Sequence, residues 1–220
     1  MKALGIWILL VVGIVAYYKY SYPSYTYRYK MTVEVDTPDG VKSGSSVIEV
    51  HTTQIPQWLK HIAGGQTKGS RAYGEAPFVD LGDKGILFTA FRGSYADRLY
   101  PRVYSGKGHA GWKPGGVPEY AIDKAFKKEL DEENYPTLVY FEDLSDVKTM
   151  NVVKPNNIVK YFGDGFNLKS LKIEVTNEKP QKEVELVLPD FKKLSGLSTR
   201  ERGLPFGITK TDFVGLKYDQ

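Results

Sequence analysis

The three histidines are the first residues to consider for catalysis or metal binding, because the chain contains no cysteine. Without cysteine there can be no disulfide, thiol nucleophile or thiolate metal ligand. His51 and His61 both lie outside any H-E-x-x-H zinc motif. A catalytic triad needs a histidine beside a serine and an acid, and the sequence alone does not bring such a set together. We therefore expect no metal site and no cofactor, and we assign no catalytic residue.

A glycine-rich stretch around the third histidine is the best candidate for binding. Residues 106–116 read GKGHAGWKPGG, and glycine lets a loop approach a ligand closely. Just upstream, arginines alternate with tyrosines, a combination typical of protein interfaces and anion sites. The candidate binding residues are Arg92, Tyr95, Arg98, His109, Trp112 and Lys113. The alternative interpretation is an exposed loop with solvated side chains.

Motif order and charge argue against two other classes of function. Residues 64–70 read GGQTKGS, in which lysine precedes glycine, whereas a phosphate-binding loop needs Gly-Lys-Ser/Thr. The formal net charge is only +4, with 30 basic and 26 acidic residues interspersed along the chain. A nucleic-acid-binding domain would gather its basic residues into a patch or stripe. We therefore expect neither a nucleotide cofactor nor a nucleic-acid partner.

The strongest single feature is an apolar run near the N-terminus. Residues 3–16 read ALGIWILLVVGIVA without a charge, and two tyrosines follow. As a helix, residues 3–18 would be roughly 24 Å long, slightly less than the hydrocarbon core of roughly 30 Å. Trp7 and the tyrosines suit the membrane interfaces. We predict a single-pass transmembrane helix over residues 1–20, with residues 3–18 in contact with the lipid bilayer.

Two alternatives to an uncleaved anchor remain. A cleaved signal peptide has a similar length, but bulky Tyr17, Tyr18 and Tyr20 stand where a small-residue cleavage site would be. A buried helix is the other alternative, although the run has no polar face. Lysines on both sides leave the positive-inside rule undecided. A short N-terminal tail before a large domain favours export, so we predict a bacterial inner-membrane protein with a periplasmic C-terminal domain.

Tyrosine is abundant immediately after the apolar run. Residues 17–29 read YYKYSYPSYTYRY, and Pro23 should end the helix. We interpret residues 21–29 as a tyrosine-rich stalk at the membrane interface, where a ring with a polar tip is favourable. A stacking platform for sugars or bases is the alternative.

The remainder, residues 30–220, has the pattern of a strand-rich soluble domain. Residues 27–36 alternate apolar and polar side chains, residues 37–40 read TPDG, and residues 46–53 form a second strand-like segment. Together they predict a β-hairpin. Further strands are expected at 78–81, 85–91, 138–142, 150–153, 171–175 and 184–188, a helix at 118–129, and a short helix at 155–162 ended by Gly163. Residues 94–118 are expected to be irregular. The predicted fold class is α+β, mainly antiparallel, with one or two packed helices.

Two phrases of the soluble domain resemble a known group of sequences. Residues 32–50, TVEVDTPDGVKSGSSVIEV, and residues 161–176, YFGDGFNLKSLKIEVT, resemble an uncharacterised family of bacterial, mostly proteobacterial, membrane-associated proteins. The resemblance covers most of the soluble domain. It implies a bacterial origin and membrane association, and it transfers no catalytic residue because the family has no known activity.

Three functions are compatible with these observations. We favour a non-enzymatic, membrane-anchored accessory protein that binds a protein partner in the cell envelope through the arginine- and tyrosine-rich region. An envelope module that binds glycans or small ligands is the second possibility. An unrecognised hydrolase that uses His51 or His109 is the third.

Overall fold

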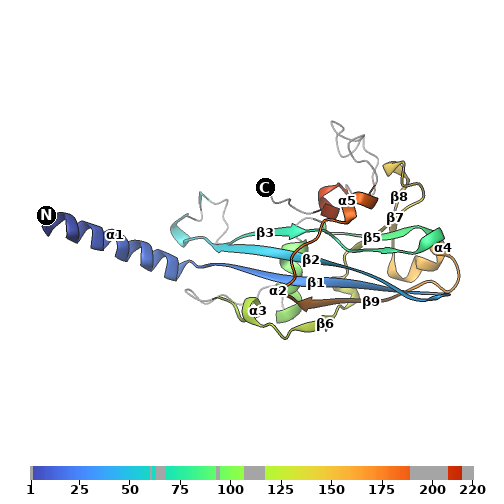
Figure 1. Cartoon of the computed structure of the whole chain (residues 1–220), viewed down its shortest axis with the longest axis horizontal. Coiled ribbons are helices and arrows are strands. Elements are labelled where there is room, and N and C mark those ends of the chain that lie inside the picture. Colours follow the sequence, from blue (N-terminus) through green and yellow to red (C-terminus); the bar gives the residue numbers. More distant parts are fainter. Residues whose placement is uncertain are drawn as a thin grey trace.

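A long N-terminal helix, α1 (Lys2–Ser21), projects from one end of a domain made of two β-sheets (Figure 1). This computed structural model describes residues 2–59, 61–62, 68–92, 95–106, 117–188 and 208–214. The predicted class is confirmed: the fold is α+β, both sheets are antiparallel, and the helices of the domain are short.

The first sheet has five strands in the order β3-β2-β1-β9-β6. Its strands are β1 (Ser24–Thr37), β2 (Gly40–Gln54), β3 (Lys68–Gly74), β6 (Lys127–Glu129) and β9 (Asn167–Val175). The predicted hairpin is confirmed, because Thr37 pairs with Gly40 and the ladder continues back to the pair of Ser24 and Thr53. Gly40 has a φ of 115°, which only glycine adopts at low cost, and so permits the tight turn.

The second sheet has four strands in the order β4-β5-β7-β8. They are β4 (Phe78–Asp80), β5 (Ile86–Ala90), β7 (Thr137–Phe141) and β8 (Met150–Val153). This sheet meets the first at Gly44 of β2, where a Cβ atom would overlap the backbone carbonyl of Phe78. A side chain larger than hydrogen at Gly44 would therefore force the two sheets apart.

Short helices complete the domain. The α-helices are α2 (Tyr95–Ser105), α3 (Glu119–Ile122), α4 (Ile158–Phe162), α5 (Val184–Val187) and α6 (Thr211–Val214). Single 3₁₀ turns occur at η1 (Gln57–Leu59), η2 (Gly82–Lys84), η3 (Glu132–Asn134), η4 (Val147–Thr149) and η5 (Pro155–Asn157). The predicted short helix before Gly163 is confirmed, with η5 leading into α4 and Gly163 at φ 98° after it.

Two hydrophobic cores lie on opposite faces of the second sheet. The first core joins that sheet to the five-stranded sheet and α2, and includes Val33, Leu87 and Leu138. The second core joins its other face to α5 and α6, through Phe88 and Phe213 among others. Both early and late parts of the sequence thus contribute to the interior, since Tyr25 belongs to the first core and Phe213 to the second.

Three predicted elements are wrong. Residues 118–129 form α3 and then β6 rather than one helix, because Lys127–Glu129 pair with the edge of β9. Residues 184–187 form α5 rather than a strand. The segment 94–118, expected to be irregular, contains α2, which accommodates Pro101 in its interior.

Apolar side chains of α1 are exposed along most of its length. Successive residues are exposed: Ile6, Trp7, Ile8, Leu9, Leu10, Val11 and Val12. Because successive helical residues point about 100° apart, every side of α1 is apolar. Even so, within the described part of the chain no helix reaches the combination of length and apolarity that a membrane crossing requires.

Candidate functional site

The arginine- and tyrosine-rich region predicted as a binding surface is only partly described. Arg92 follows β5 and Arg98 belongs to α2, and both side chains are exposed. Three of the other four predicted residues, His109, Trp112 and Lys113, lie outside the described residues. The structure thus leaves two arginines as the testable part of this predicted surface.

Tyr95 has a structural role rather than a surface one. Its hydroxyl donates a hydrogen bond to the backbone carbonyl of Asn134, and its ring stacks on Phe91 with the ring centroids 5.5 Å apart. Burial raises the pKa of Tyr95 far above the usual tyrosine value. Tyr95 therefore holds α2 against the turn before β7 through its side chain, while its backbone N–H donates to the Arg92 carbonyl at 3.2 Å.

Three of the four tyrosines in residues 21–29, which were expected to form an interfacial stalk, are instead part of the first core. Tyr25, Tyr27 and Tyr29 lie on β1, and all three side chains are buried. The Tyr29 hydroxyl donates to the carbonyl of Ala96 at 2.6 Å, and the Tyr27 hydroxyl donates to that of Asp97 at 3.1 Å. Burial is the main cause that raises the pKa of both residues. Their rings are therefore not presented to lipid, sugars or bases.

The same aromatic cluster continues into α2 and α3. The Tyr25 and Tyr120 hydroxyl oxygens are 2.7 Å apart, and the Tyr100 hydroxyl donates to the Tyr120 carbonyl at 2.7 Å. Edge-to-face packing joins Tyr27 to Tyr120, with ring centroids 5.5 Å apart. These hydrogen bonds fix α3 beside the first residues of β1, at the end of the domain from which α1 emerges.

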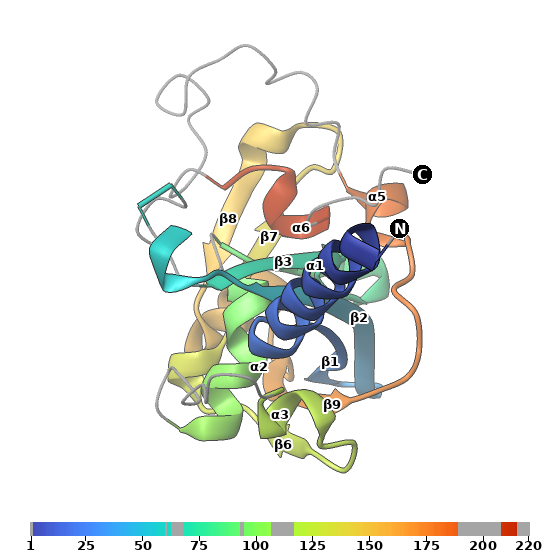
Figure 2. The same ribbon diagram turned by 90° about the vertical axis from the view of Figure 1, so that its left-hand side faces the viewer.

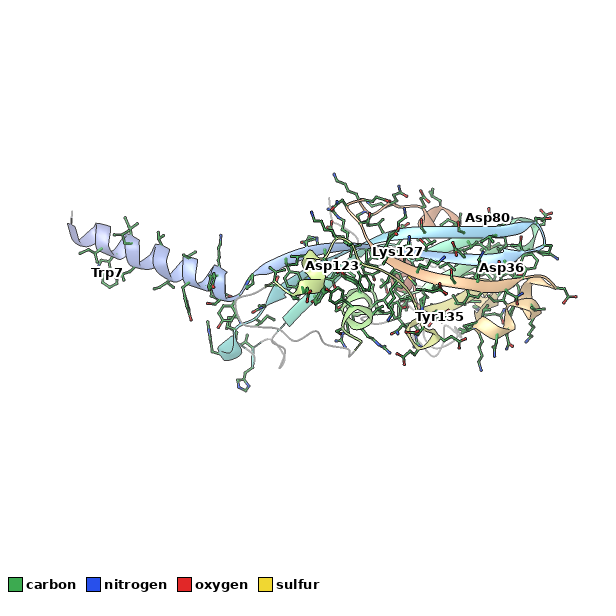
Figure 3. All side chains as sticks on the ribbon, turned by 90° about the horizontal axis from the view of Figure 1, so that it is seen from below. Trp7, Asp36, Asp80, Asp123, Lys127 and Tyr135 are labelled. Carbon is green, nitrogen blue, oxygen red and sulfur yellow. The ribbon has the colours of Figure 1, made fainter. Side chains whose placement is uncertain are left out.

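The junction between α1 and the domain is short. Only Tyr22 and Pro23 separate the end of α1 from the start of β1. The Tyr22 N–H donates to the Tyr18 carbonyl at 2.9 Å, and the two rings pack with centroids 5.2 Å apart. Proline then ends the helix because it lacks an N–H and has a fixed φ. α1 therefore leads almost directly into β1, as Figure 3 shows.

A charged cluster occupies the face of the five-stranded sheet opposite the first core. Glu49 is almost completely buried and bonds to Arg28 Nε through one carboxylate oxygen and to His51 Nε2 through the other, at 2.6 Å. The His51 ring also packs edge-on against Tyr73, with centroids 5.1 Å apart. Burial raises the pKa of Glu49, but the hydrogen bonds from His51 and Arg28 outweigh it and hold the pKa below its usual value. Glu49 is therefore an ionised bridge between strands.

A second ion pair lies further along the same face. Glu34 Oε2 accepts hydrogen bonds from Lys172 Nζ at 2.7 Å and from Ser170 Oγ at 2.6 Å. The hydrogen bond from Lys172 is the main cause that lowers the pKa of Glu34, and the same bond raises the pKa of Lys172. The chain after β9 also binds this face, because Lys30 Nζ contacts both carboxylate oxygens of Glu178 at 3.1 Å. These charges are engaged within the domain.

Sequence reasoning did not identify the pair of Arg28 and Glu49, although the signal was present. Thr37 pairs with Gly40 at the turn. Arg28 lies nine residues before Thr37 and Glu49 nine residues after Gly40, so the ladder places them opposite each other. A correctly placed turn therefore fixes this cross-strand ion pair. What the register alone does not reveal is that Glu49 would be buried while its neighbour His51 stays exposed.

Among the residues that the structure describes, the hydrogen bonds given above do not join a histidine, a serine and an acid into a catalytic triad. The contacts of His51 named above are with a carboxylate and an aromatic ring rather than with a nucleophile. Among the residues that the structure describes, no group of three histidine or acidic side chains is placed to hold a metal ion. No protein-family model, curated protein or solved structure matches this chain. Function must therefore be argued from the surfaces of the molecule, and α1 is the most distinctive of them.

Proposed function

We propose that this protein is a membrane-attached accessory protein, in which α1 enters a lipid bilayer and holds the domain at the membrane surface for a protein partner. The observation that carries this proposal is the exposure of apolar side chains on every side of α1. A groove on another protein covers one face of a helix, whereas lipid surrounds all of them. Lipid is therefore the environment that matches α1.

The length of α1 constrains how it would sit in the bilayer. Its apolar stretch is shorter than the roughly 20 residues that span a hydrocarbon core. Lys19 stands in the last turn of α1, where its long side chain can reach the headgroups while the bilayer thins locally. We propose a single pass through a bacterial inner membrane. Export of the domain to the periplasm is supported by the absence of cysteine, which suits an oxidising compartment.

Charged substitutions in α1 test the attachment. Full-length protein is mixed with lipid vesicles, and the fraction that floats with them in a density gradient is measured. The double variant Leu9→Lys with Val12→Lys should stay at the bottom, because each lysine near the helix centre costs about 2.5–3.5 kcal/mol. Val41→Lys is the matched control, since Val41 is an exposed apolar residue at the opposite end of the domain, and it should float normally. Equal flotation of all three proteins would refute the proposal.

The absence of cysteine also makes the orientation measurable. An introduced cysteine is the only thiol in the chain, so a membrane-impermeant maleimide reports which side it is on. In intact cells with a permeabilised outer membrane, Asp39→Cys, in the β1–β2 turn, should be labelled, and Lys2→Cys should be labelled only after lysis. The reverse pattern would place the domain in the cytoplasm.

The partner-binding part of the proposal rests on the exposed arginines. Arg98 lies on the solvent side of α2, and arginine is enriched at protein interfaces. In a pull-down from detergent-solubilised membranes, a stoichiometric partner of the wild type should be lost with Arg98→Glu and retained with Lys154→Glu, an exposed control. Retention by both variants would remove Arg98 from the interface. Glycan or small-ligand binding stays the alternative: of the tyrosines that suggested it, Tyr25, Tyr27 and Tyr29 are buried, whereas Tyr17, Tyr18 and Tyr20 are exposed on α1.

A further inference from the structure

Besides α1, the end of the domain from which the helix emerges carries its own exposed apolar residues. Trp58 is 70% exposed and Ile62 is 84% exposed. Both belong to the connection between β2 and β3, which begins with η1. Two backbone hydrogen bonds shape it, from Leu59 N–H to the Pro56 carbonyl at 2.9 Å and from Ile62 N–H to the Leu59 carbonyl at 3.0 Å. Trp58 and Ile62 are thus two large, exposed apolar side chains only four residues apart in the same short connection, and exposed apolar side chains that occur together mark interaction sites.

The strand register places this connection next to α1. Ser24, the first residue of β1, pairs with Thr53 near the end of β2. The chain that follows Thr53 therefore continues past the start of β1, toward the side on which α1 lies. Figure 1 shows η1 beside the base of α1, and Figure 2, which looks along the helix, shows η1 to one side of it.

We propose that Trp58 and Ile62 form a second membrane contact, which inserts into the headgroup region of the same bilayer that holds α1. This inference rests on the proposed attachment of α1. If the apolar part of α1 lies in the hydrocarbon, the last turn of α1 is at the headgroups, and the adjoining connection is at the same level. Tryptophan is the residue best suited to that layer, because its ring is apolar and its N–H remains hydrated.

Two membrane contacts, unlike α1 alone, would fix the orientation of the domain relative to the bilayer. A domain held by α1 alone can turn about the helix axis and tilt at the junction formed by Tyr22 and Pro23. A second contact, to one side of the axis, fixes which face of the domain is turned toward the membrane. The far end, marked by Asp36 in Figure 3, then points away from the bilayer.

Fluorescence of Trp58 tests the contact directly. The chain has three tryptophans, so the variant Trp7→Phe with Trp112→Phe leaves Trp58 as the only one. This full-length variant is reconstituted into phosphatidylcholine and phosphatidylglycerol vesicles, with or without bromine on the acyl chains close to the headgroup. We expect Trp58 to lose about half or more of its emission in the brominated vesicles, because an interfacial ring touches the upper acyl chains.

A matched control places the only tryptophan at the other end of the domain. In a chain with all three native tryptophans changed to phenylalanine, Val41→Trp puts the probe at an exposed position that pairs with Asp36. Its emission should be the same in both kinds of vesicle. Adding Ile62→Asp to the Trp58 reporter should reduce the quenching, since a carboxylate is repelled from the anionic surface.

The outcomes separate the two proposals. Flotation with quenching of Trp58 but not of the Val41→Trp probe supports both. Flotation with unquenched Trp58 leaves the attachment of α1 intact and overturns the second contact. Failure to float overturns the attachment, and with it the second contact. Circular dichroism of each variant verifies that the domain is folded.

Discussion

On β1, the odd-numbered residues from Tyr25 to Val35 are buried in the first core, whereas the even-numbered residues between them are polar and include Arg28 and Glu34, whose charges pair across the sheet. The two faces of this strand are stabilised by different interactions. The aromatic face combines large apolar rings with hydroxyls that donate to backbone carbonyls, and the charged face links strands through carboxylates. The tyrosines of β1 thus stabilise the interior, whereas Tyr17, Tyr18 and Tyr20 of α1 are exposed.

The largest effect should come from removing a ring on the aromatic face. Tyr29→Ala should lower the free energy of unfolding by about 3–5 kcal/mol, because it leaves a cavity in the first core. Tyr29→Phe keeps the ring, removes only the hydrogen bond to Ala96, and should cost about 0.5–1.5 kcal/mol. Urea unfolding of the full chain in mild detergent measures both. Equal losses for the two variants would mean that the hydroxyl, not ring packing, dominates.

A smaller loss of unfolding free energy should follow from adding a methyl group between the two sheets. In Gly44→Ala the new Cβ would overlap the Phe78 carbonyl, so β4 must shift, at a cost of about 2–3 kcal/mol. Ser45→Ala is the neighbouring control, since Ser45 is exposed on the charged face and should change stability by less than about 0.5 kcal/mol. If Gly44→Ala were as stable as Ser45→Ala, the close contact of the sheets would be wrong.

The smallest loss of unfolding free energy should come from substitutions on the charged face. Glu49→Gln keeps the shape but replaces two charge-assisted hydrogen bonds, and should cost about 1–2 kcal/mol at neutral pH. Glu178→Gln is the comparison, since the pair of Lys30 and Glu178 is exposed and should be worth less than about 0.5 kcal/mol. The same urea titrations apply.

The cost of Glu49→Gln should also depend on pH. Because the folded state holds the pKa of Glu49 below its usual value, the ionised carboxylate stabilises the fold above the unfolded pKa of about 4.3. This contribution is lost as the pH falls through the lower, folded pKa. The difference in unfolding free energy between wild type and Glu49→Gln should therefore be full at pH 7 and shrink in acid. A difference that grows in acid would contradict this sign.

Much of the first sheet could be predicted from the sequence, because local patterns determine it. The alternating pattern of residues 27–36 predicts β1, and that of residues 171–175 predicts β9. The turn at Gly40 then places β2 beside β1. The elements that failed depend on distant contacts. Lys127–Glu129 became a strand because the edge of β9 was open, and α2 forms despite Pro101 because its buried face packs on the first core.

The candidate site was less predictable than the fold. Tyr25, Tyr27 and Tyr29 continue the alternation of β1, but the sequence does not say that α2 and α3 would cover them. Arg92 and Arg98 are exposed, as expected of a binding surface, whereas the Tyr95 hydroxyl is hydrogen-bonded to the Asn134 carbonyl. Trp58 and Ile62 stand out only once the register of β1 and β2 places them beside α1.

The position of β1 within its sheet has a consequence for biosynthesis. β1 is flanked by β2 on one side and by β9 on the other. A ribosome releases β2 directly after β1, but Asn167–Val175 emerge only late in translation. Until then, one edge of β1 has no partner strand, and such an edge readily pairs with other chains. A nascent chain of this protein therefore needs its central strand shielded from neighbouring chains until β9 has been made.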